Sequence, residues 1–133
     1  MNSTGIVRGF WEAMRSNDFN RAVREWLAVD YIGLWPQSAE LIRGPGAYAA
    51  VNNAFPGRGD WRFEEISLLA DGDRVATDMR ITNAPLEVVI HAITFHDICA
   101  GKISRQTEYW PDSYPAPAWR AEFLERDPAQ ARF

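Results

Sequence analysis

The sequence predicts an α+β protein in which helices come first and a hairpin-rich sheet follows. Three observations predict this class. Apolar residues recur with helical spacing in the first half of the chain, and they follow strand spacing from Trp61 onward. Turn-forming residues separate the strand candidates. A chain of 133 residues has the usual length of one domain, so we expect a single domain over residues 1–133.

Three helices are predicted from apolar stripes with the i, i+3, i+4, i+7 spacing. The first stripe consists of Val7, Phe10, Trp11 and Met14, with Ser3 or Thr4 as the cap. The second consists of Phe19, Ala22, Val23, Trp26 and Leu27. The third follows Pro45, a residue that suits a helix start, and consists of Tyr48, Val51, Asn52 and Phe55. A short amphipathic helix is also expected over residues 118–126 near the C-terminus.

The strand candidates are residues 30–35, 40–43, 61–70, 74–83, 86–97 and 102–110. The last four are long, and they are separated by residues 71–73, 84–85 and 98–101. These separators contain Gly, Pro, Asp or Ala and are plausible hairpin loops.

Composition excludes several classes of function. The net charge is −4 and the basic residues are scattered, which argues against nucleic-acid binding. A single Cys99 rules out an internal disulfide and favours the cytoplasm. The chain begins without signal-peptide features and has no run of about 18 apolar residues, so no membrane span is expected. Its two histidines, and the lack of any cofactor motif, predict neither a metal site nor a cofactor.

A possible acid–base site emerges from the register of the last hairpins. If residues 98–101 form a four-residue loop, His91 faces Glu108; if residues 84–85 form a two-residue loop, Asp78 flanks His91 on its other side. A carboxylate–imidazole–carboxylate row could move protons, and a dry pocket would raise the pKa of Glu108. Alternatively, the row lies on the outer face of the sheet as solvated pairs, since one residue of slippage reverses the faces.

The order of elements and the closing segment from Gly101 to Asp112 resemble the nuclear transport factor 2-like superfamily. Within it, the chain is similar to the ketosteroid isomerases and SnoaL-like polyketide cyclases over about residues 4–126. The resemblance implies a cone-shaped barrel made by a curved mixed, mostly antiparallel sheet that wraps around three N-terminal helices (a cystatin-like roll), with a short C-terminal helix. It also implies an apolar cavity and a homodimer formed through the outer sheet face.

The resemblance assigns functional roles unevenly. Trp110 matches a Trp of the isomerase pocket, and this alignment places Gln106 and Glu108 on the cavity wall. The family's three catalytic groups fall at about His91 (oxyanion-hole acid), Trp35 (general base) and Phe10 (oxyanion-hole Tyr), so two of the three are replaced by apolar residues. Known isomerase chemistry is therefore not expected. The cyclases need only one acid–base group, a role that Glu108 or Asp78 could fill.

We therefore expect a cofactor-independent enzyme acting on a small apolar molecule such as a polyketide-like or steroid-like ring. Glu108 is the predicted acid/base, with His91 or Asp78 assisting. The candidate ligand-binding residues are Trp35, Tyr48, Asn52, Gln106, Trp110 and Phe10. The alternative is a non-catalytic ligand-binding or dimerisation module of the same shape. With 13% aromatic residues, the chain has more rings than one small core needs, which favours a homodimer.

Overall fold

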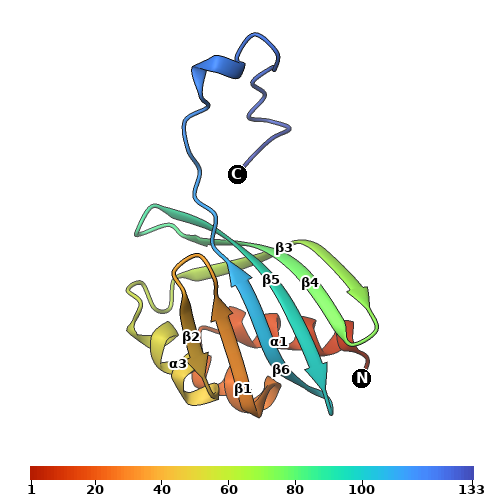
Figure 1. Ribbon diagram of the computed structural model, residues 1–133. Helices are drawn as coiled ribbons and strands as arrows, with labels where there is room; N and C mark the ends of the chain where they lie inside the picture. The colour runs from red at the N-terminus through yellow and green to blue at the C-terminus, as the bar shows by residue number, and fades with distance from the viewer.

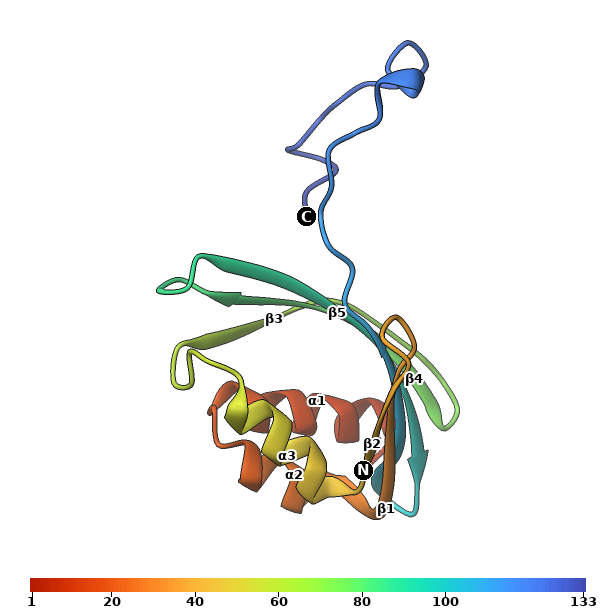
Figure 2. The same ribbon diagram turned by 60° about the vertical axis from the view of Figure 1, so that its left-hand side comes forward.

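The computed structural model describes residues 1–133 and consists of three helices packed in the hollow of one curved, six-stranded sheet (Figures 1 and 2). The elements in chain order are α1 (Ser3–Arg15), α2 (Phe19–Trp26), β1 (Leu27–Trp35), β2 (Glu40–Arg43), α3 (Pro45–Ala54), β3 (Trp61–Asp71), β4 (Arg74–Asn83), β5 (Val88–Cys99), β6 (Lys102–Tyr109) and the 3₁₀ turn η1 (Ala118–Arg120). The predicted α+β class is confirmed.

The strand order is β2-β1-β6-β5-β4-β3, so β2 and β3 are the edges and the sheet does not close into a barrel. Only β1 and β6 run parallel; all other neighbours are antiparallel. The N-terminal helices lie against the concave face (Figure 2). No helix combines the length and the apolar character needed to cross a membrane.

The helical stripes account for much of the core. All four residues of the predicted α1 stripe are buried. Asn2, rather than Ser3 or Thr4, caps α1 by accepting a hydrogen bond from the Gly5 N–H. Asp18 caps α2 through the Arg21 N–H, and Leu27, placed in the second stripe by its spacing, begins β1 instead.

Two glycines in helices make a matched test of the packing. A Cβ added at Gly9 would lie 2.2 Å from the Trp26 ring, whereas one added at Gly46 would meet no atom within 4 Å. We expect Gly9→Ala to destabilise the fold by about 2 kcal/mol, despite the better helix propensity of Ala, because the α1–α2 contact must move apart. Gly46→Ala should stabilise it by up to about 1 kcal/mol. Urea unfolding measures both; equal effects would contradict the packing.

The inner and outer faces of the sheet are set by strand alternation. On β4 the odd-numbered residues from Val75 to Asn83 are buried, and on β5 the even-numbered residues Ala92, Thr94 and His96 are buried. The predicted hairpin loops were wrong in length. The β4–β5 connection is four residues, 84–87, rather than two, and the β5–β6 connection is Ala100-Gly101 rather than four residues.

A β-bulge in β6 decides which way Glu108 points. Cys99 pairs with Lys102 and Ile98 with Ile103, but Asp97 then pairs with Arg105, which leaves Ser104 as the extra residue. The shorter β5–β6 loop alone shifts the register by two residues. Because side chains alternate with a period of two, this shift would have kept Glu108 on the same face of the sheet as His91. The bulge adds one more position, so Glu108 pairs with Thr94 on the inner face.

The C-terminal helix is shorter than predicted. Residues 118–126 were expected to be helical, but only Ala118–Arg120 form a single 3₁₀ turn. This segment lies on a projecting stretch of chain, away from the sheet (Figure 1). Short helices are marginal in water unless an apolar face packs on something, and Trp119 and Phe123 are more than 70% exposed.

Candidate functional site

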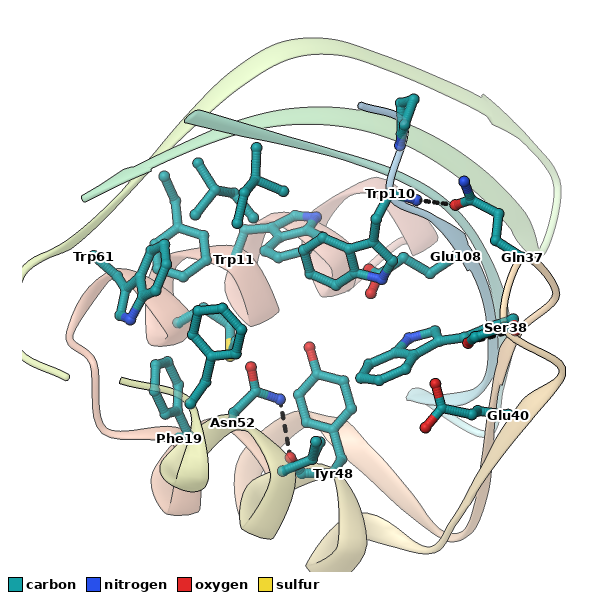
Figure 3. A pocket seen from close by; sticks show the side chains of 18 of the residues that line it. Trp11, Phe19, Gln37, Ser38, Glu40, Tyr48, Asn52, Trp61, Glu108 and Trp110 are labelled. Carbon is teal, nitrogen blue, oxygen red and sulfur yellow. Dashed lines mark hydrogen bonds between the residues drawn. The ribbon is translucent and has the colours of Figure 1, made fainter. Parts of the chain in front are cut away.

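An apolar cavity of about 530 Å³ lies between the concave face of the sheet and the helices (Figure 3). Thirteen of the twenty residues that line it are hydrophobic, which suits a small apolar molecule. Aromatic walls come from α1, α2, β1, α3, β3 and the end of β6: Trp11, Phe19, Trp35, Tyr48, Phe55, Trp61, Phe63 and Trp110. The cavity is also lined by Gln37 and Ser38 from the β1–β2 connection, by Glu40 at the start of β2, and by Pro111 and Asp112.

Glu108 is the buried acid of this cavity. Its side chain is 3% exposed, and the Thr94 hydroxyl donates a 2.6 Å hydrogen bond to its Oε2. Burial raises the pKa of Glu108 to about 7, although the hydrogen bond from Thr94 and the nearby Trp35 side chain act in the opposite direction. Figure 3 shows the carboxyl beside the Trp110 indole. A carboxyl with this pKa can give or take a proton near neutral pH.

Two polar groups of α3 face the same cavity. The Tyr48 hydroxyl points into it, and the Asn52 carbonyl does the same (Figure 3). The Asn52 amide nitrogen donates to the Tyr48 backbone carbonyl at 2.9 Å, which orients the side chain. Burial, assisted by the nearby Glu108, holds the pKa of Tyr48 well above its ordinary value. Tyr48 is therefore a neutral hydrogen-bond donor at neutral pH.

A buried polar chain runs behind the cavity wall. The Tyr31 hydroxyl donates to Gln106 Oε1 at 2.6 Å, and Gln106 Nε2 lies 3.0 Å from His96 Nδ1. Since the amide nitrogen must donate, His96 Nδ1 is an acceptor and Nε2 carries the proton toward Thr77 Oγ1, 2.9 Å away. Burial lowers the pKa of His96 to about 3, in agreement with a neutral ring. Trp11 Nε1 also donates to Thr77 Oγ1, at 3.3 Å, so the chain ends at a cavity-lining residue.

This polar chain should stabilise the fold measurably. Tyr31→Phe removes one hydroxyl and leaves the buried Gln106 carbonyl without its donor, so we expect a loss of about 2 kcal/mol in the free energy of unfolding. The matched control is Tyr114→Phe, because Tyr114 is 73% exposed; its loss should be near zero. Denaturant unfolding of both variants checks this. Equal, small effects of the two substitutions would mean that this chain of hydrogen bonds contributes nothing to the free energy of unfolding.

The predicted row of Asp78, His91 and Glu108 does not form. Asp78 and His91 do touch, with His91 Nδ1 2.7 Å from Asp78 Oδ1, but across a diagonal: Asp78 pairs with Ile93 and His91 with Arg80. Both lie on the outer face of the sheet, and the His91 ring packs on Phe133 at 4.8 Å. The prediction that His91 faces Glu108 was therefore wrong, because the bulge in β6 reverses the face of Glu108 relative to its neighbour.

The six candidate ligand-binding residues divide into two groups. Trp35, Tyr48, Asn52 and Trp110 line the cavity, and the Trp35 and Trp110 rings meet edge to face at 5.9 Å. Gln106 and Phe10 do not line it. Gln106 is held in the polar chain, and Phe10 is wholly buried beside the Tyr48 and His96 rings.

Sequence reasoning missed Thr94 and His96. Both come from a strand whose two faces are largely apolar, so alternation gave no sign of which residues point inward. Their inward position follows from their pairing with Glu108 and Gln106. No group of three or more His, Cys, Asp or Glu side chains lies close enough to hold a metal ion.

Comparison with known families agrees with this architecture. The model of the SnoaL-like domain matches residues 7–106, which is most of the chain, and the protein therefore belongs to the SnoaL-like family within the nuclear transport factor 2-like fold. Among curated proteins, no sequence matches it significantly.

Solved structures repeat the fold closely. A crystal structure from Kribbella flavida, provisionally named a ketosteroid isomerase, has 28% sequence identity and a TM-score of 0.85, covering 96% of this chain and 91% of its own. An NTF2-like protein of unknown function from Burkholderia xenovorans has 24% identity and a TM-score of 0.76, with 94% of each chain covered. An LEH-like epoxide hydrolase from Mycobacterium tuberculosis has 22% identity and a TM-score of 0.67, with 82% of each covered.

Proposed function

We propose that this protein binds a small apolar molecule, polyketide-like or steroid-like, in its cavity and carries out acid–base chemistry on it without a cofactor. The observation that carries the proposal is Glu108, a buried carboxyl with a pKa of about 7 that faces an otherwise apolar cavity. An acid placed in such surroundings costs stability, so its presence at the cavity wall favours a functional role. Isomerisation, cyclisation or hydrolysis would each fit.

The proposed chemistry is proton transfer next to a carbonyl group. The ionised Glu108 takes a proton from the carbon beside the carbonyl, and the electron pair moves onto the carbonyl oxygen. The neutral Tyr48 hydroxyl then donates to the developing enolate oxygen, and the acid returns the proton at the same or another carbon. The aromatic walls exclude water, which raises the pKa of Glu108 to about 7 and makes its carboxylate a stronger base than that of an exposed Glu. Asn52 can orient a polar substituent of the ligand through its free carbonyl.

The provisional ketosteroid isomerase from Kribbella flavida is similar along nearly the whole chain, which supports a carbonyl compound as ligand. Even so, the steroid-isomerase arrangement is not proposed, because Phe10 is wholly buried and Trp35 is an apolar wall. These two substitutions favour the second candidate, a protein that binds the same class of ligand without altering it. Both candidate functions require the cavity, but only the enzymatic function requires the Glu108 carboxyl.

Deuterium exchange distinguishes the two candidates. Native mass spectrometry would first identify which cyclic ketones from a panel bind, with the corresponding hydrocarbons as matched controls that lack the carbonyl. The bound ketones would then be incubated with the protein in D₂O and followed by NMR. Deuterium appearing beside the carbonyl faster than with heat-denatured protein supports catalysis. Bound ketones that stay unexchanged support the non-catalytic binder, and binding of neither set contradicts both.

Assembly and location complete the proposal. We expect a homodimer formed through the outer face of the sheet, where Leu69, Ala76, Phe95 and Thr107 form one row across four strands. Leu69 is 71% and Phe95 41% exposed, so a second copy would bury apolar surface there. The single free Cys99 suits the reducing cytoplasm.

A further inference from the structure

The last 23 residues, 111–133, form an arm that leaves the body of the protein. It rises from the end of β6 on the convex side of the sheet, turns at η1 and returns toward the same side (Figures 1 and 2). The hydrogen bonds found within residues 118–131 are internal to the arm, and its end touches the body through Arg80 and His91, which contact Phe133. The outer part of the arm is not held by the body.

The same part of the arm is rich in exposed apolar side chains. Tyr114, Trp119 and Phe123 are each 72–73% exposed, and Leu124 is 60% exposed. Four large apolar residues within eleven positions, all facing water, form an unusual surface for a lone chain. Such a segment gains free energy when a second surface covers it.

The projecting arm is not peculiar to this chain. The arm makes up about 17% of the sequence. The Kribbella flavida crystal structure matches 96% of this chain and the Burkholderia xenovorans structure 94%, so both matches must include most of the arm. An extended arm that is matched in structures sharing only 28% and 24% identity points to an external support common to these proteins. A second copy of the same chain is the partner that every such protein has.

The outer sheet face is the surface that a second copy would meet. The arm rises from this face, so it reaches past a copy stacked on the sheet and can lie against that copy's flank. In a dimer with two-fold symmetry each arm would contact the other subunit in the same way. The exposed apolar side chains of both arms would then be covered. The exposed Phe95 and Leu69 lie on this outer face.

We infer that residues 111–133 are a dimerisation arm whose Trp119, Phe123 and Leu124 side chains pack against the second copy. The inference rests on the dimer proposed above and adds a surface to it. It also connects assembly to the site: Pro111 and Asp112, at the root of the arm, line the cavity, and Trp110 donates its backbone N–H to Gln37 just before them. Docking of the arm on the partner therefore holds one wall of the cavity.

The test compares the full chain with the triple variant Trp119→Ser, Phe123→Ser, Leu124→Ser, which leaves the cavity-lining residues intact. Light scattering after size exclusion would be measured over a dilution series. The matched control is Val29→Ser, since Val29 is 93% exposed on β1, away from the arm. We expect the wild type and the control to run at twice 15.1 kDa and the triple variant to dissociate at concentrations at least about 100-fold higher.

The outcomes separate the arm from the dimer. A wild-type protein of 15.1 kDa throughout would overturn both proposals. A dimer whose dissociation constant is unchanged in the triple variant would overturn the arm alone. Hydrogen exchange adds a second readout: amides of residues 118–124 should be protected only at concentrations where the dimer forms. Equal protection in a diluted monomer would mean that the arm covers its own chain, which also contradicts the inference.

Discussion

Replacing Glu108 by Gln should slow the exchange of ketone protons in the cavity by ~10²- to 10⁴-fold, the usual contribution of a positioned acid or base. Gln has nearly the same shape and still accepts the hydrogen bond from Thr94, so ligand binding should change little. In the wild type the rate should rise with pH up to about 7, because the reacting form is the ionised acid. In the variant the residual rate should lose that pH dependence.

The control for this experiment is Glu12→Gln, which removes an exposed carboxylate from α1, away from the cavity. Its exchange rate should equal that of the wild type. NMR measurement of deuterium uptake at several pH values compares the three proteins. Full exchange activity in Glu108→Gln would reject the proposed role of this residue and leave the cavity as a binding site.

The second large effect concerns stability rather than rate. Below pH 4.5 Glu108 is protonated whether the chain is folded or not. Between pH 4.5 and about 7 the unfolded chain releases this proton while the folded protein keeps it, so the folded state binds more protons and stability falls as pH rises. Above pH 7 the loss is complete, at about 3 kcal/mol. The Glu108→Gln variant has no titratable group at this position, so its stability should not show this loss.

Urea unfolding of wild type and Glu108→Gln at pH 5 and pH 8 isolates the effect. The buried His96 has the opposite effect, because its lowered pKa makes the folded state more stable as pH rises from about 3. His96 is present in both proteins, so its contribution cancels when their stabilities are subtracted. We expect the variant to gain about 2.5 kcal/mol relative to wild type between these two pH values, because the unfolded chain has already released part of this proton at pH 5. A difference that stays constant would show that Glu108 titrates as an ordinary, solvated acid.

The helices and the positions of the strands along the chain were largely predictable because their signals are local. Val7, Phe10 and Met14 repeat every turn of one helix, so spacing alone reveals their buried face. The cavity walls could also be anticipated in part: Trp35 and Trp110 stand where strands end, and both line the cavity. These predictions did not depend on the register between neighbouring strands.

The catalytic row failed because register depends on features without a sequence signal here. Ala100 adopts a φ of 51° and Gly101 of 78°, a tight two-residue turn in which an Ala at positive φ is unexpected. The bulge at Ser104 is likewise unmarked in the sequence. Together they turn Glu108 toward Thr94 and leave His91 outside. An odd shift exchanges the two faces of a strand, so a small local error removed a whole site.

The central claim is that the apolar cavity raises the pKa of Glu108 to about 7, and this titration can be observed directly. With ¹³C-labelled Glu, the side-chain carboxyl resonance that disappears in Glu108→Gln identifies the residue, and its chemical shift is followed from pH 4 to pH 9. The structure predicts a midpoint at a pKa of about 7. A midpoint near 4.5, the value of an exposed Glu, would mean that water reaches the carboxyl and would contradict the proposed site.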